Sequence, residues 1–139
     1  YDENYGHSEK LHQFVKWALE GAEISLKELD GVCVSKGPGS YTGLRIGVSA
    51  AKGFCFGLNI PLISLNSLEI LAQFQIHKGF DLIIPMIDAR RMEVYTAVFD
   101  GSGKMNSEIE AKILNEYSFK EFGEKKIALI GDAVKKSKI

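Results

Sequence analysis

The sequence predicts an α/β fold with a mixed sheet, and three features of its 139 residues support this prediction. Short runs rich in β-branched residues alternate with segments whose apolar residues recur every three or four positions. Two neighbouring runs, 82–87 and 92–99, are separated by too few residues for a crossover helix, so they predict an antiparallel hairpin. The helices that separate the other strands favour parallel pairing, and the sheet should therefore be mixed.

The first half of the chain should contain two long helices. Residues 7–20 carry one apolar stripe at helical spacing, and residues 42–57 form a second helical segment. A short strand at 31–35 precedes the second helix, and a Pro-led strand at 62–65 follows it.

The second half should add a third helix and further strands. Asn66, with a glutamate three residues later, has the pattern of a capping box that opens a helix. After the hairpin, residues 108–114 predict a third antiparallel strand, Ser118 predicts a short helix start, and 126–131 predicts another strand that leads into a short helix.

Composition limits the classes of function. The chain has 17 basic and 18 acidic residues, a net charge of −1, so binding nucleic acid by charge alone is not expected. No apolar run approaches the roughly 20 residues that span a bilayer, and a cytoplasmic protein is therefore expected. Cys33 and Cys55 both lie in apolar stretches and are predicted to be buried free thiols.

The segment KGPGSYTGLRIG, residues 36–47, is the most unusual in the chain. A glycine-rich loop between a strand and a helix suits an anion, but this one matches neither a Walker A loop nor G-x-G-x-x-G. Gly37, Gly39 and Gly43 are spaced by two and then four residues. We predict that Gly39, and Gly37 with it, takes a positive φ where the strand turns into the helix.

Small residues follow a regular spacing in the predicted helix 42–57. Gly43, Gly47 and Ala51 recur every four residues and share one face, while Gly53 and Gly57 repeat the spacing on a neighbouring face. Each interior glycine costs about 1 kcal/mol relative to alanine, so a compensating interaction is expected. Two explanations remain open: close packing within the chain, or docking on a helix of another subunit.

Three blocks of sequence resemble the bacterial TsaB (YeaZ) family. Residues 35–73 are similar to the family's most recognisable block, with its GPGS(F/Y)TG(L/V)RIG core. HSEKL (7–11) resembles the start of the family's first long helix, and IDARRMEVYTAVF (87–99) resembles its second signature. The three blocks occur in the family's order.

The resemblance implies an actin-like (ASKHA, ribonuclease H-like) fold, a mixed sheet with flanking helices built as two related lobes. Residues 1–75 would be the first lobe without its first hairpin, and residues 76–139 the start of the second lobe. By comparison with the family, the chain is expected to be truncated at both ends.

The resemblance also implies a function. Family members are non-catalytic scaffold subunits in the formation of N6-threonylcarbamoyladenosine at position 37 of tRNA (t6A37). They pair with the catalytic subunit TsaD, and the ATPase TsaE binds the pair. A homodimer is expected when the chain is alone, contact with tRNA is expected only indirectly, and neither a cofactor, a metal nor a membrane is expected.

The candidate site residues fall into three groups. The predicted partner interface lies on the two long helices and comprises Leu11, Phe14, Val15, Ala18, Gly43, Leu44, Gly47, Val48, Ala51 and Phe54. The family-motif loop comprises Gly37, Pro38, Gly39, Ser40, Tyr41, Thr42 and Arg45. The second motif comprises Asp88, Arg90, Arg91, Glu93 and Tyr95, which either contact a partner or form a solvated turn with a cross-strand ion pair.

The alternative is an actin-like nucleotide-binding enzyme or a metallopeptidase (M22 glycoprotease-like) relative. His7 and His12 are five residues apart, about 140° around a helix, so they do not face one metal ion. No arrangement of Ser, His and Asp or of Cys and His indicates a nucleophile. The sequence therefore favours the scaffold over the enzyme.

Overall fold

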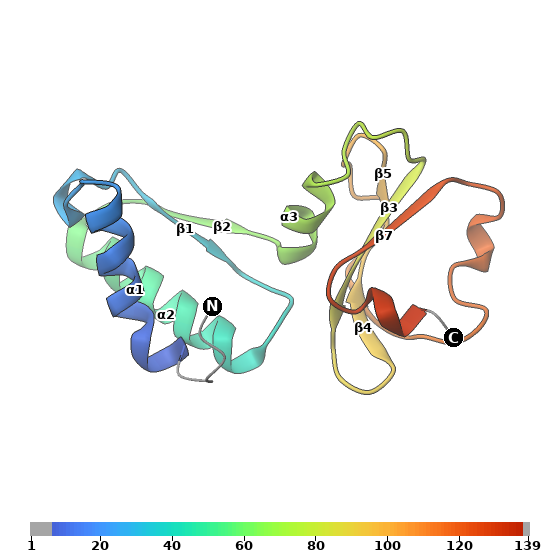
Figure 1. The fold of residues 1–139 in the computed structure, drawn as a ribbon, viewed down its shortest axis with the longest axis horizontal. Helices are drawn as coiled ribbons and strands as arrows, with labels where there is room; N and C mark the ends of the chain where they lie inside the picture. The colour runs from blue at the N-terminus through green and yellow to red at the C-terminus, as the bar shows by residue number, and fades with distance from the viewer. Residues whose placement is uncertain (1–6, 138–139) are drawn as a thin grey trace. The chain divides into compact units, whose positions relative to one another are not determined.

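The computed structural model describes residues 7–137, which divide into two compact units (Figure 1). Within the described range, the first unit contains the chain up to Lys36 and the segment Ser40–Leu65. The second unit contains Gly37–Gly39 and the chain from Asn66 onward. From Asn66 the chain belongs to the second unit, so this boundary lies earlier than the lobe boundary predicted after residue 75. The reason is that the helix capped by Asn66 packs on the sheet of the second unit.

The first unit places two helices beside a small sheet. Its elements are α1 (His7–Gly21), η1 (Leu26–Glu28), β1 (Val32–Ser35), α2 (Tyr41–Leu58) and β2 (Leu62–Leu65). Strands β1 and β2 are parallel, with Val32 opposite Leu62 and Ser35 opposite Leu65. Helix α2 connects the two strands and packs against β1, which is the βαβ arrangement that parallel pairing requires.

The outer face of this two-stranded sheet is open in the described structure. Cys33 lies opposite Ile63, and both are exposed, Ile63 to 52%. Leu65 is also 41% exposed. The prediction that both thiols are buried is therefore wrong for Cys33 and confirmed for Cys55, because only the sheet face that meets α2 is covered.

The second unit is built around a five-stranded mixed sheet. Its elements are α3 (Ser67–Gln73), β3 (Leu82–Asp88), β4 (Glu93–Thr96), β5 (Phe99–Asp100), β6 (Glu110–Ile113), η2 (Lys120–Phe122), β7 (Ile127–Ile130) and η3 (Val134–Ser137). The order is β5-β3-β4-β6, and β7 pairs with β3 in parallel while the other pairs are antiparallel. The mixed sheet, the β3–β4 hairpin and the third antiparallel strand are confirmed.

Apolar clusters cover both faces of this sheet. One cluster packs Leu68 and Ala72 of α3 against Ile83 and Phe99, and all four are at most 1% exposed. The other cluster is centred on Ile84, Met86, Val94, Leu114 and Ala133. The helices predicted after Ser118 and at the end of the chain are only the short 3-10 turns η2 and η3.

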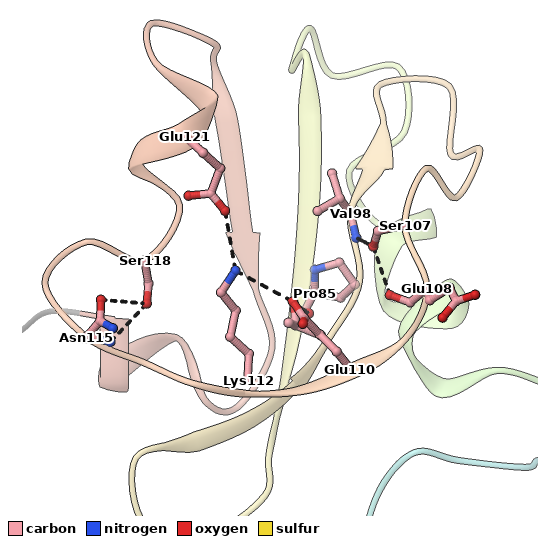
Figure 2. A network of polar contacts seen from close by, with 10 residues as sticks. Pro85, Val98, Ser107, Glu108, Glu110, Lys112, Asn115, Ser118 and Glu121 are labelled. Carbon is pink, nitrogen blue, oxygen red and sulfur yellow. Dashed lines mark hydrogen bonds and ion pairs between the residues drawn. The ribbon is translucent and has the colours of Figure 1, made fainter.

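The predicted strand 92–99 is interrupted in the structure. Its two parts keep one register along β3, because Thr96 pairs with Met86 and Phe99 pairs with Ile83. Pro85 has no N–H to offer the strand between these pairs. Beside this break, the Val98 N–H donates to Ser107 Oγ at 2.9 Å, and that hydroxyl donates to the carbonyl of Glu108 (Figure 2).

A lysine ties the edge strand β6 to the turn that follows it. Lys112 Nζ lies 3.4 Å from Glu121 and 3.6 Å from Glu110 (Figure 2). The ammonium group also lies 5.1 Å from the centre of the Phe119 ring. This lysine therefore holds η2 over the sheet face that carries the second cluster.

Candidate partner-binding surface

The glycine-rich loop changes direction between β1 and α2. Gly37 has φ +102° and Gly39 has φ +158°, so the predicted positive φ is confirmed at both, with Gly39 at the boundary of extended backbone. The peptide bond between Gly37 and Pro38 is cis. Gly37 is buried, and its carbonyl accepts a hydrogen bond from the Ser67 N–H at 2.9 Å.

The rest of the motif loop opens helix α2. Ser40 is the N-cap residue, and its hydroxyl accepts from the Gly43 N–H at 3.3 Å. Tyr41, Thr42 and Arg45 are exposed, Tyr41 to 74%. Arg45 donates to the Tyr41 hydroxyl at 3.2 Å and lies 5.2 Å from the centre of its ring.

One face of α2 packs on the sheet of its own unit. Ala51 and Cys55 are its buried residues, and the Cys55 thiol donates to the Pro61 carbonyl at 3.4 Å. Leu44 and Val48 precede them at helical spacing and are half-buried. The structure thus corrects the assignment of Ala51 to a partner surface, because that side chain, 5% exposed, fills the unit's own interior.

The opposite side of α2 forms a groove with α1. Its volume is about 710 Å³, and it is lined by Leu11, His12, Arg45, Ile46, Ser49, Ala50, Gly53 and Phe54. The ring of His12 meets that of Phe54 edge-on, with centroids 5.6 Å apart, and this contact forms part of the groove's floor. The groove contains two predicted interface residues, Leu11 and Phe54.

Five groove residues lie outside the predicted sites: His12, Ile46, Ser49, Ala50 and Gly53. The available signal for Gly53 was its four-residue spacing from Gly57, on the face next to that of Gly43, Gly47 and Ala51. An added Cβ at Gly47, Gly53 or Gly57 would meet no atom within 4 Å outside the helix's own nearby backbone. Close packing within the described chain therefore does not explain these glycines.

The predicted interface residues of α1 lie on two sides of the helix. Val15 lines a second depression of about 370 Å³, together with Leu19, Ile24 and Leu26. Ala18 is exposed, and Phe14 packs its half-buried ring 5.6 Å from the ring of Trp17, itself 54% exposed. Gly43 contacts only its own cap residue, since its Cβ would lie 3.5 Å from Ser40.

The second motif forms the turn between β3 and β4. Arg90 and Arg91 have φ angles of +74° and +47° and are exposed. Glu93 starts β4, where its N–H donates to the Arg90 carbonyl at 3.0 Å, and Tyr95 pairs with Ile87. Among residues 7–137, neither Arg90 nor Arg91 forms the predicted ion pair across the strands with Glu93.

Asp88 connects this turn to the end of the described chain. Lys136 Nζ donates to its Oδ1 at 2.7 Å, and the Asp88 N–H donates to Asp132 Oδ1 at 3.0 Å. The bond from Lys136, followed by that from the Arg90 N–H, holds the pKa of the Asp88 carboxyl below its usual value.

Two features of residues 7–137 bear on other classes of function. No group of three or more His, Cys, Asp and Glu side chains there is placed to hold a metal ion. None of the helices in the same range has both the length and the apolar character needed to cross a membrane.

Curated relatives carry a common name. The chain is 44% identical over 94 residues to the tRNA threonylcarbamoyladenosine biosynthesis protein TsaB of Bacillus subtilis (strain 168). The aligned residues make up 67% of this chain and 40% of that protein. It is 34% identical over 94 residues to the protein of the same name from Escherichia coli (strain K12), covering 67% and 41%. The chain thus spans about two fifths of these relatives.

A family model and solved structures agree with these relatives. The model of TsaD, tRNA N6-adenosine threonylcarbamoyltransferase, matches residues 4–135. The structure of YeaZ from Pseudomonas aeruginosa superposes with a TM-score of 0.65 at 30% identity, over 81% of this chain and 54% of that one. These matches confirm the predicted actin-like fold class. The chain therefore belongs to the TsaD family, and its relatives place it among the TsaB (YeaZ) proteins.

Proposed function

We propose that the protein is a non-catalytic scaffold subunit in the biosynthesis of N6-threonylcarbamoyladenosine at position 37 of tRNA. It acts by pairing with a TsaD-type transferase, and a TsaE-type ATPase binds the pair. The names of the TsaB relatives support the pathway, and the open groove on α2 supports a role in pairing.

The observation that carries the proposal is that a Cβ added at Gly47, Gly53 or Gly57 of α2 would meet no atom within 4 Å outside the nearby helix backbone. Gly53 lines the groove beside Ile46 and Ala50, so another helix can approach its backbone closely. Phe56 lies on the same helix and is 92% exposed, so it adds apolar area that a partner would cover. The helix thus gives up intrinsic stability along a face that remains unused within its own unit.

The same groove supports self-association when the transferase is absent. Leu11 and Phe54 supply apolar contacts, and a two-fold axis would place the same groove on both copies. In the cell the protein would act in the cytoplasm, and tRNA would be bound through the paired transferase, because the chain's 17 basic and 18 acidic residues give no net attraction for RNA.

The test uses a Gly53→Leu variant and a purified TsaD-type transferase. A leucine in the groove should push the partner helix away and weaken pairing by about 1–3 kcal/mol, the usual range for overpacking. The fold should survive, because the new side chain enters open space. Pull-down and sizing chromatography measure the pairing, and circular dichroism checks the fold.

Gly21→Leu is the matched control. Gly21 ends α1, and a Cβ there would also meet no atom within 4 Å, but the residue lies outside the groove. Its variant should pair like the parent chain. A folded Gly53→Leu protein that pairs with undiminished affinity would contradict the assignment of the groove to pairing.

The non-catalytic role has a test of its own. Adding the chain to a complete reaction with transferase, tRNA and threonylcarbamoyl donor should raise the yield of modified adenosine. The chain with donor and tRNA alone should yield none. Modification without the transferase would contradict the non-catalytic role.

A further inference from the structure

The groove between α1 and α2 carries side-chain charge of one sign. Among the described residues that line it, the ionisable groups are Arg45 and His12, and no carboxylate is present. The sequence accounts for this excess, because no acidic residue occurs from position 31 to position 68, whereas Lys36, Arg45 and Lys52 all lie in that segment. Helix α2 therefore brings only positive side-chain charge to the groove.

Arg45 keeps most of its hydrogen-bonding capacity unused. Its guanidinium donates to the Tyr41 hydroxyl at 3.2 Å and lies 5.2 Å from the centre of that ring. Within residues 7–137, this arginine forms no ion pair. Because Arg45 is exposed and a guanidinium group carries five N–H donors, several donors remain available to a partner.

The rest of the groove suits the close approach of a helix. Ala50 and Gly53 have little or no side chain, and Ile46 and Phe54 beside them offer apolar contacts. Arg45 lies eight residues before Gly53, which corresponds to about 12 Å along α2. A helix that lies along α2 would therefore meet Gly53 with a small residue and Arg45 with a side chain about two turns away.

The charges distinguish between two occupants of the groove. A second copy of the chain, related by a two-fold axis, would bring the same described lining residues to the interface. Those residues include no carboxylate, so the copy's groove offers Arg45 no ion pair. Charge complementarity therefore favours a different chain, one that carries an acidic side chain on the helix that enters the groove.

We propose that Arg45 selects the partner of this groove. The occupant is a helix of the TsaD-type transferase that places a small residue against Gly53 and a glutamate or aspartate against Arg45. The guanidinium and the carboxylate form a hydrogen-bonded ion pair, which self-association lacks, so Arg45 favours the heterodimer over the homodimer. This proposal rests on the pairing function proposed above.

The test measures the Kd of the whole chain for a purified TsaD-type transferase by isothermal titration calorimetry. Arg45→Gln removes the charge and should weaken pairing about tenfold, as expected for the loss of a charge-assisted hydrogen-bonded pair. Arg45→Lys keeps the charge and should lose less. Lys52→Gln is the matched control, because it removes the same charge from an exposed position of α2 outside the groove lining and should change affinity by less than about twofold.

Salt provides a readout that a merely structural role of Arg45 would not change. Raising the ionic strength from about 0.05 M to about 0.5 M should weaken pairing of the parent chain and of Lys52→Gln, because salt screens an ion pair at the edge of the interface. Pairing of Arg45→Gln should be less sensitive to salt. Equal salt dependence in the parent chain and Arg45→Gln would contradict the proposal.

Self-association should respond in the opposite direction. In sedimentation equilibrium of the chain alone, Arg45→Gln should self-associate at least as tightly as the parent chain, because the homodimer has no ion pair to lose and less repulsion between like charges. Weaker self-association of Arg45→Gln would show that a carboxylate of the second copy engages Arg45, and would overturn the proposal.

The Gly53→Leu variant separates failure of this proposal from failure of the pairing function. If Gly53→Leu weakens binding to the transferase and Arg45→Gln does not, the groove is the pairing surface and Arg45 does not select its partner. If neither substitution weakens binding, the pairing function of the groove fails as well. Circular dichroism checks that each variant is folded, which is expected because Arg45 and Gly53 are both exposed.

Discussion

The two units of the chain use their apolar residues in opposite ways. The second unit encloses large side chains completely, with Ile83, Met86 and Phe99 at 0% exposure between the sheet and its coverings. In the described part of the first unit, the buried apolar residues are the small Ala51 and Cys55, while Phe56 and Ile63 are exposed. Burial of large side chains is the main stabilising term of a fold, so the second unit has by far the larger internal core.

This contrast shows where the chain's stability and its binding surfaces lie. In the second unit, large apolar side chains form a buried core, although Phe74 and Ile113 remain 66% and 69% exposed. In the first unit, apolar residues and glycines remain on the surface, where association rather than folding would bury them. Matched substitutions in the two units should therefore differ in their effects.

The largest contrast should come from two phenylalanines. Phe99→Ala removes a fully buried ring and should destabilise the second unit by about 3–5 kcal/mol. Phe56→Ala removes a ring that is 92% exposed and should change stability by less than about 0.5 kcal/mol. Urea denaturation followed by circular dichroism measures both, and similar losses would show that the first unit buries Phe56 in solution.

Two glycines provide the next contrast. Gly131→Ala places a Cβ 2.1 Å from the Met86 carbonyl oxygen at φ +115°, and should destabilise the second unit by about 3 kcal/mol. Gly53→Ala enters open space in a helix and should stabilise α2 by up to about 1 kcal/mol. Thermal melting of both variants shows whether each substitution lowers or raises stability. A destabilising Gly53→Ala would place an unseen neighbour within the monomer.

The stability costs of removing a helix cap should differ less between the units than the costs of the phenylalanine and glycine substitutions. Asn66 is 6% exposed, and its Oδ1 accepts from the Leu68 N–H at 2.8 Å, so Asn66→Ala should cost about 1 kcal/mol. Ser40 caps α2 at an exposed site through a longer bond of 3.3 Å, so Ser40→Ala should cost less. Hydrogen exchange of the first-turn amides of α3 and α2 measures each effect locally, and a larger loss at α2 would reverse the comparison.

The smallest effect concerns pH. The pKa of Asp88 is lowered in the folded chain, so its contribution to stability is present above the unfolded pKa of about 3.9 and is lost as pH falls through the folded value. Lys136→Met removes the main cause of that shift. The stability difference between parent and variant should therefore be constant near neutral pH and shrink below about pH 4. A difference independent of pH would show that Lys136 acts only through its hydrogen bond to the Glu93 carbonyl.

Strands in the second unit were predictable because their residues are buried and largely β-branched. The runs 82–87 and 126–131 correspond to β3 and β7. The break after Thr96 was not predictable, since it depends on Pro85 of the partner strand, and local periodicity does not report which residues face one another. The two parts keep one register along β3, and the ladder between them is interrupted where Pro85 lacks an N–H.

Predicting the first unit was limited in another way. The spacing of Gly43, Gly47 and Ala51 correctly groups residues along a helix, but it does not say which face meets the sheet. In the structure, Ala51 and Cys55 are the buried residues of α2, and Gly53 lies in the groove. The exposure of Cys33 was not predicted for a related reason. The sequence of an apolar strand does not indicate whether one or both of its faces are covered.

The two thiols of the first unit differ in solvent exposure, so their rates of labelling report how often this unit opens. Cys33 is exposed, whereas Cys55 is 9% exposed and bonded to the Pro61 carbonyl, and no other cysteine is present. A maleimide dye should therefore modify the first position at once and the second only when α2 leaves its strands. Mass spectrometry of the doubly labelled fraction over time would then measure how fast the first unit opens. Opening of the second unit would not be detected, because both cysteines lie in the first unit.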